Sequence, residues 1–228
     1  LPTGAVLSYY YDAEHPSKDI GSTIVNKFAT DEFKKFADRT YYYAQKGFIS
    51  PSCQSVATAN DYRTACQTTG DYLSGKGTPI VGSIGGEWLT IGLARSGRTV
   101  PEGYYDNAVA YVKAKINTTT NRLDRNKSTD NARLILALTA IGKDVTDVGG
   151  FDLLAGLDDM KYVKRQGTNG PVWTLIALDS HGYTPAGSVT RDALVETILS
   201  LQKDSGAWYI NSTNTTDDVD MTAMAIQA

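Results

Sequence analysis

Four segments of this chain align with one another without gaps, and this internal repeat constrains the fold more than any other feature. The segments end at residues 93, 138, 178 and 228, so they recur at intervals of 45, 40 and 50 residues. A period of this length is typical of repeat architectures. Each segment begins with a helix-capping or helix-breaking residue and continues with small or apolar residues. The aligned segments are G-G-E-W-L-T-I-G-L (85–93), D-N-A-R-L-I-L-A-L (130–138), G-P-V-W-T-L-I-A-L (170–178) and D-M-T-A-M-A-I-Q-A (220–228).

The composition of each segment predicts a helix that is apolar all round and therefore buried on all sides. The first three segments soon reach Gly97, Gly142 and Gly182, which suit the end of a helix. Between the segments, apolar side chains recur at three-to-four spacing over residues 103–116, 151–163 and 190–202, as in helices with one wet face. Alternation of buried and amphipathic helices implies an inner ring surrounded by an outer one. We therefore predict an all-α fold, an α/α toroid forming part of an α6/α6 barrel.

The first 77 residues lack this repeat, so we predict an N-terminal segment of cap helices over residues 1–77 and the toroid repeats over residues 78–228. Residues 1–26 show no helical period, whereas helices are expected over 31–47 and 56–73. Two cysteines, Cys53 and Cys66, flank the start of the second of these helices. Their spacing allows a disulfide but does not fix the Cα separation, and two free thiols are the alternative.

Size and charge narrow the possible partners. The chain has 228 residues, of which 41% are hydrophobic, enough to bury one sizeable core or two small ones. The net charge is −3 and there is no polybasic run, which argues against binding to nucleic acid or to anionic membrane surfaces. No uncharged apolar run approaches the roughly 20 residues that a membrane span needs. The sequence therefore predicts no transmembrane segment.

A family resemblance lies near the end of the chain. Residues 202–208, Q-K-D-S-G-A-W, match the Q-x-x-x-G-x-W repeat of squalene cyclases and related terpene cyclases. From about residue 78 onward, the chain resembles the prenyltransferase and squalene-cyclase repeat domains of secreted Gram-positive surface proteins. This resemblance implies a terpenoid cyclase-like toroid located outside the cell or at the cell surface. Residues 26–51 resemble a helix and turn of extracellular solute-binding proteins, and the N-terminal segment is either the remnant of a fused domain or a cap on the toroid.

The aspartates before the last segment are the first candidates for catalysis. Class II terpene cyclases protonate an alkene with an Asp-x-Asp-Asp motif, which Asp218-Val219-Asp220 resembles. Here the order is Asp-Asp-x-Asp, and Met221 occupies the position of the second adjacent acid. Aspartates at a helix start also cap free N–H groups and interact favourably with the helix dipole. We therefore expect no cyclisation of squalene or shorter prenyl substrates.

In a toroid, the starts of the inner helices gather at one mouth, which gives a second set of candidates. Aromatic rings beside carboxylates and amides are the composition of a carbohydrate or small-molecule site. Paired carboxylates on such a fold also describe many glycoside hydrolases, while core packing is an equally good reading of the two tryptophans. The candidate ligand-binding residues are Trp88, Tyr104, Tyr105, Arg133, Asn169 and Trp173, and the candidate catalytic acids are Glu87, Asp130, Asp218 and Asp220.

A metal site is not expected. Protein prenyltransferases share the toroid and hold zinc with Asp, Cys and His, but this chain has only His15 and His181, and neither is near a cysteine in sequence. We therefore predict no metal and no cofactor.

Together, the sequence features favour a non-catalytic ligand-binding or structural module of a bacterial surface protein, with a small molecule, a glycan or a cell-surface partner as its ligand. The alternative is a toroid enzyme, terpene-cyclase-like or carbohydrate-active, that uses the four acids.

Overall fold

The computed structural model describes residues 59–211, 213 and 216–228. These residues form eight α-helices and two short 3-10 helices, and no strand occurs among them. The all-α prediction is therefore confirmed for this part of the chain. The elements are α5 (Ala59–Ser74), α6 (Ile84–Arg95), α7 (Tyr104–Lys115), α8 (Ser128–Ala140), η1 (Ala155–Leu157), α9 (Met160–Val163), η2 (Lys164–Gln166), α10 (Asn169–Asp179), α11 (Arg191–Ser200) and α12 (Val219–Gln227).

The chain divides into two compact units. The larger unit comprises Arg63–Leu201 and Trp208–Ala228, and it contains all ten of the candidate binding and catalytic residues. The other comprises Leu1–Tyr62 and Gln202–Ala207. Most of α5 belongs to the larger unit, and the division expected between residues 77 and 78 stays a prediction. The helix expected over 31–47 and Cys53 lie outside the described residues.

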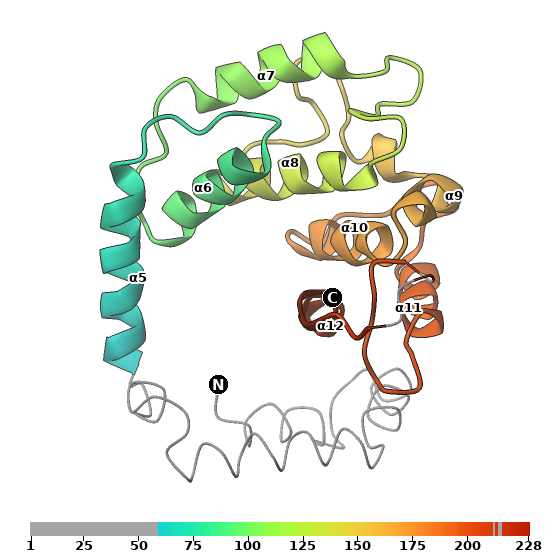
Figure 1. The fold of residues 1–228 in the computed structure, drawn as a ribbon. Helices are drawn as coiled ribbons and strands as arrows, with labels where there is room; N and C mark the ends of the chain where they lie inside the picture. Colours follow the sequence, from blue (N-terminus) through green and yellow to red (C-terminus); the bar gives the residue numbers. More distant parts are fainter. Residues whose placement is uncertain (1–58, 212, 214–215) are drawn as a thin grey trace, which may run out of the picture. The chain divides into compact units, whose positions relative to one another are not determined.

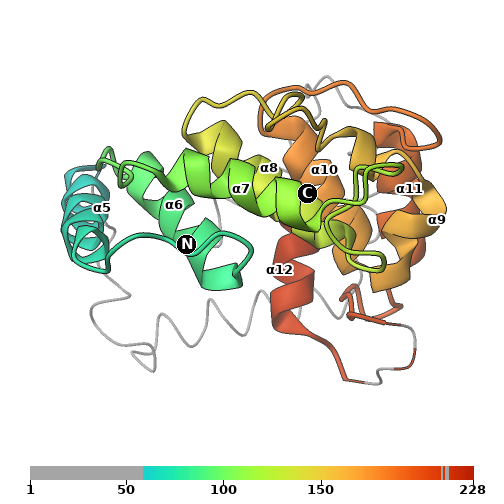
Figure 2. The same ribbon diagram turned by 90° about the horizontal axis from the view of Figure 1, so that it is seen from above.

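The four repeated segments coincide with α6, α8, α10 and α12, and these helices pack in sequence order. Helix α8 contacts α6 and α10, and α10 contacts α11 and α12. Helix α7 lies alongside α8, on the side away from α10 (Figure 1), and the second view agrees (Figure 2). The core between α7 and α8 is built from Ala108 and Val112 of α7 and from Leu134, Ile135 and Leu138 of α8. Because α8 has neighbours on three sides, it is the central helix of the larger unit.

The first three repeated helices end in the same way. After α8, the N–H of Gly142 donates to the carbonyl of Thr139, and the N–H of Lys143 donates to the carbonyl of Leu138. This pair of bonds is a Schellman motif, which requires a left-handed residue, and Gly142 has φ of 68°. The same two bonds follow α6 at Gly97 and α10 at Gly182. The prediction that these glycines end the helices is confirmed.

One of the three predicted amphipathic helices does not form. The helices expected over 103–116 and 190–202 are α7 and α11, whereas residues 151–163 contain only turns, η1 and the four-residue α9. The carboxylate of Asp152 accepts hydrogen bonds from the N–H groups of Leu154 and Ala155, at 2.8 and 3.2 Å. Asp159 is the N-cap of α9 and accepts from the N–H of Lys161 at 2.8 Å. The turn at Asp152 competes with helix formation, and the cap at Asp159 starts a new helix, so the apolar spacing alone gave a wrong prediction here.

Candidate functional site

The repeated helices are not buried on all sides, which corrects the expectation from their composition. Each helix has one stripe of side chains that stays at least partly exposed. The stripe occupies the same aligned positions of the repeat, here called registers, in all four helices. On the opposite side, two registers are buried in all four helices. One register comprises residues 86, 131, 171 and 221, and the other comprises residues 90, 135, 175 and 225. The exposed stripe comprises Ile84, Trp88 and Ile91 of α6, Thr129, Arg133 and Leu136 of α8, Asn169, Trp173 and Ile176 of α10, and Val219, Ala223 and Ile226 of α12.

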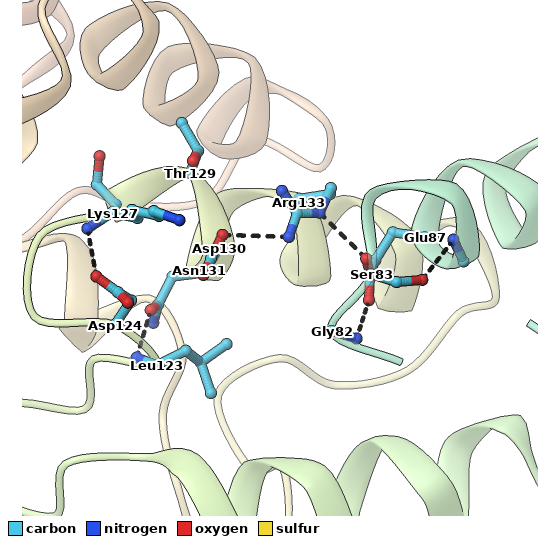
Figure 3. Close-up of polar contacts among 12 residues, drawn as sticks. Gly82, Ser83, Glu87, Leu123, Asp124, Lys127, Thr129, Asp130, Asn131 and Arg133 are labelled. Atoms are coloured by element: carbon cyan, nitrogen blue, oxygen red, sulfur yellow. Dashed lines mark hydrogen bonds and ion pairs between the residues drawn. The ribbon is translucent and has the colours of Figure 1, made fainter. Parts of the chain in front are cut away.

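An ion-pair network joins α6 to α8 beside this stripe. Arg133 Nε donates to Glu87 Oε2 at 3.1 Å, and Arg133 Nη2 donates to Asp130 Oδ1, also at 3.1 Å. The second oxygen of Glu87, Oε1, accepts from the backbone N–H of Gly82 at 2.6 Å. Figure 3 shows these side chains meeting between the start of α6 and the first turns of α8. The structure therefore brings together three of the predicted site residues and holds two carboxylates on one guanidinium.

Local capping places Glu87 in this network. Ser83 is the N-cap of α6, and its hydroxyl accepts from the N–H of Gly86 at 3.0 Å. This cap starts the helix where Glu87 lies in the first turn and points back toward Gly82 (Figure 3). The Glu87 side chain is only 1% exposed, and burial raises its pKa above the ordinary value, against the opposing effect of the bonds from Gly82 and Arg133. Both carboxylate oxygens of Glu87 are thus committed to contacts inside the protein.

The two candidate tryptophans contact each other. The ring centroids of Trp88 on α6 and Trp173 on α10 are 5.3 Å apart, with planes tilted by 59°. Trp88 is 40% exposed, and Trp173 is partly buried against the core. Since α8 contacts both α6 and α10, the contact between the two rings joins the stripe of α6 to that of α10. Trp88, Arg133 and Trp173 occupy the same register of the repeat on these three helices.

The two candidate tyrosines lie in a different environment. Tyr104 is 1% exposed and belongs to the core, and its burial raises the pKa of its hydroxyl to about 12. Tyr105 is packed partly against the same core, with Lys143 Nζ 4.7 Å from its ring centroid. Both belong to α7, which does not carry the repeat. Neither side chain is part of the exposed stripe.

Of the two candidate aspartates at the last helix, Asp218 has a structural role. Asp218 is the N-cap of α12, and its Oδ1 accepts from the N–H of Met221 at 2.9 Å. Asp220 is exposed in the first turn, and Met221 is buried at 1% exposure. Met221 thus faces the interior at the position where a cyclase motif would have an acid. The capping explanation of Asp218 is confirmed.

The Q-x-x-x-G-x-W motif supplies structural contacts. Gln202 Nε2 donates to the carbonyl of Gly206 at 2.9 Å, which closes the turn between them. Trp208 is 2% exposed, and its indole Nε1 donates to the carbonyl of Ile198 in α11 at 2.7 Å. The backbone N–H of Trp208 donates to the hydroxyl of Thr222 in α12 at 3.1 Å. Trp208 therefore fastens α11 to α12 and is not available to a ligand.

Sequence reasoning missed two polar side chains that position α8. Asn131 is fully buried, and its amide accepts from the N–H of Leu123 and donates to the carbonyls of Asn121 and Leu153, at 2.8 to 3.0 Å. Gln166 lies far along the sequence, yet its Oε1 accepts from the N–H of Thr129 at 3.0 Å at the start of α8. A polar residue in a register that is otherwise buried was the available signal for Asn131. No signal in the sequence links Gln166 to α8.

The remaining expectations concern cysteine, metal and membrane. Cys66 is exposed and is a free cysteine among the described residues, and its expected partner lies outside them, so the pairing stays a prediction. Within residues 59–211, 213 and 216–228, no three His, Cys, Asp or Glu side chains gather as a metal site would require. None of the described helices is both long and apolar enough to cross a membrane.

Comparison of the chain with protein-family models, with curated proteins and with solved structures finds no match.

Proposed function

We propose that the chain is an α/α toroid module that binds a ligand without transforming it, on the exposed stripe of its repeated helices. One observation carries the proposal: the same register is at least partly exposed in all four helices, and on three of them it holds Trp88, Arg133 and Trp173. Folding requires the buried registers to be apolar or internally hydrogen-bonded, but it makes no such demand on an exposed one. Large aromatic and guanidinium groups there are typical of binding surfaces.

The toroid itself is part of the proposal. Repeated helices that pack in sequence order, with α7 and α11 against them, support an inner and an outer layer. The resemblance of the chain to repeat domains of secreted Gram-positive surface proteins supports a location outside the cell or at the cell surface. A small molecule, a glycan or a cell-surface partner is then the ligand.

The contacts of the four acids favour binding over catalysis. An acid catalyst needs a carboxyl oxygen within hydrogen-bond reach of the substrate. Glu87 is buried with both oxygens bonded, and Asp130 is held by Arg133. Asp218 caps α12, and Asp220 is exposed with Met221 as its neighbour. These contacts supply a stabilising role for three of the four carboxylates without any reaction.

Two experiments test the proposal. The first is a thermal-shift screen of small molecules and oligosaccharides on the wild type and on Trp88→Ala. We expect at least one compound to raise the melting temperature of the wild type and to lose most of that effect in the variant. Compounds that raise the melting temperature of both proteins equally would show that the binding site does not include Trp88.

The second experiment is incubation with squalene, farnesyl diphosphate and geranylgeranyl diphosphate, followed by mass spectrometry. We expect no cyclic product, because Met221 occupies the position where the class II cyclase motif has its second adjacent acid. A cyclic product that disappears in Asp220→Asn would replace the binding module with the enzyme.

A further inference from the structure

The exposed stripe contains a pair of aromatic walls. Trp88 and Trp173 are 5.3 Å apart between ring centroids and are inclined at 59°, so they are not stacked face to face on each other. Trp88 keeps 40% of its surface exposed, which leaves indole surface available to a ligand. The negative face of an aromatic ring attracts weakly positive hydrogens, such as those on the C–H face of a sugar ring, as well as cations. The aromatic pair alone therefore fits either a neutral apolar face or a cation.

Arg133 adds hydrogen-bond donors in the same register. Its Nε and Nη2 are held by Glu87 and Asp130, so the guanidinium is fixed in orientation. Its Nη1 makes no hydrogen bond to any described residue. The edge of the guanidinium that carries Nη1 is therefore preorganised, on a side chain that is 15% exposed. Preorganisation of this kind lowers the cost of binding a ligand.

The charges around Arg133 disfavour an anion. A site for a carboxylate or phosphate uses uncompensated positive charge together with several donors. Here one guanidinium is already paired with two carboxyl groups, one buried and one partly exposed. No excess positive charge remains for an anionic ligand. A neutral ligand that accepts a hydrogen bond from Nη1 has no such conflict.

Acceptors lie beside these donors. Asp130 uses only Oδ1 for Arg133, so Oδ2 can accept a further hydrogen bond. Asn169 is on the exposed stripe one helical turn before Trp173, and its side-chain amide makes no hydrogen bond to a described residue. An amide both donates and accepts. Hydroxyl groups match this mixture of donors and acceptors, whereas a quaternary ammonium ion carries no hydrogen-bonding groups at all.

We propose that this part of the stripe binds a neutral saccharide, whose sugar ring packs on Trp88 and Trp173 while its hydroxyls bond to Arg133, Asn169 and Asp130. The inference rests on the proposed binding function and names the chemical class of its ligand. The apolar C–H face and the hydroxyl rim of a sugar correspond to the aromatic and polar groups, respectively.

The test is titration calorimetry on the full chain with four neutral probes: cellohexaose, xylohexaose, maltohexaose and N-acetylchitohexaose. Oligogalacturonate and choline serve as an anionic and a cationic probe. Trp88→Ala and Asn169→Ala are the test variants, because Arg133→Ala would leave the buried Glu87 without its guanidinium. Tyr72→Ala is the matched control, since Tyr72 is an aromatic residue of α5 that is 65% exposed and lies outside the stripe.

We expect at least one neutral hexaose to bind the wild type and Tyr72→Ala equally, and its affinity to fall by about tenfold or more in both test variants, which corresponds to about 1.4 kcal/mol. If no neutral hexaose binds, or if the affinity is unchanged in Trp88→Ala, the saccharide proposal is overturned. Binding of choline or oligogalacturonate that depends on Trp88, without binding of any hexaose, also overturns it but leaves the binding function of the stripe intact.

Discussion

Asn131 and Arg133 are two positions apart on α8, yet they belong to two different surfaces. Asn131 lies in a register that is buried in all four repeats, and its amide makes three hydrogen bonds to backbone groups. Arg133 lies in a register that is at least partly exposed in all four, and its Nη1 has no hydrogen-bond partner among the described residues. The comparison separates the residues that hold the fold from those that are free to serve binding.

The largest loss of stability is expected for substitution of the buried Asn131. Asn131→Ala leaves one N–H and two carbonyl groups without partners in the interior, and each such group costs about 1–3 kcal/mol. We expect the free energy of unfolding, measured by urea denaturation, to fall by about 3–5 kcal/mol. Asn169→Ala, on the exposed stripe, should change it by less than about 0.5 kcal/mol. Equal losses for the two variants would contradict the distinction between the surfaces.

A smaller effect is expected where α8 ends. Gly142 has φ of 68°, a conformation that costs a residue with a side chain about 1–2 kcal/mol. Gly142→Ala should therefore destabilise the chain by that amount. The matched control is Gly85→Ala, because Gly85 lies in helix α6 and a Cβ there meets no atom within 4 Å. That control should stabilise the chain, by up to about 1 kcal/mol, and a loss of stability there would count against the assigned helix start.

The capping role of Asp218 predicts a loss of about 1 kcal/mol in Asp218→Ala. Asp218→Asn keeps an oxygen that can accept from the N–H of Met221, so it should lie within a few tenths of a kcal/mol of the wild type. Thermal and urea denaturation of both variants provide the measurement. If asparagine is as damaging as alanine, the carboxylate charge matters more than the cap.

The smallest effect is a pH dependence at Glu87. Burial raises the pKa of this carboxyl above its ordinary value of 4.5, so the folded chain holds the proton more tightly than the unfolded chain. The stability that Glu87 contributes is complete below its unfolded pKa and is lost as the pH rises through its folded pKa. Glu87→Gln does not titrate. The free energy of unfolding of the wild type minus that of Glu87→Gln should therefore fall as the pH rises above the ordinary value of 4.5, and a rise instead would mean that the ion pair with Arg133 dominates.

The sequence predicted the repeated helices and their ends, because glycine and capping residues act locally. Gly97, Gly142 and Gly182 end their helices as expected. The helix expected over 151–163 did not form, because apolar spacing does not reveal the turn at Asp152 or the helix start at Asp159. Local signals were reliable where the backbone conformation depends on one residue type.

The site was predictable only as a set of residues. The sequence selected Glu87, Arg133 and Asp130 but could not show that one guanidinium binds both acids, because that depends on the register between α6 and α8. It also predicted both Tyr104 and Trp88 as ligand-binding residues, although Tyr104 is 1% exposed and Trp88 is 40% exposed. The exposure of a side chain depends on which neighbouring helix covers that face, and this cannot be predicted from the composition of one helix.

The most direct test of the account is hydroxyl-radical footprinting of the native chain, with oxidation of each of the three tryptophans followed by mass spectrometry. Trp88 and Trp173 occupy the exposed stripe, while Trp208 is 2% exposed and bonded to α11. We predict that Trp88 is oxidised fastest, Trp173 more slowly, and Trp208 only after the chain is unfolded. Oxidation of Trp208 as fast as Trp88, or protection of both Trp88 and Trp173 in the native chain, would contradict the existence of an exposed stripe.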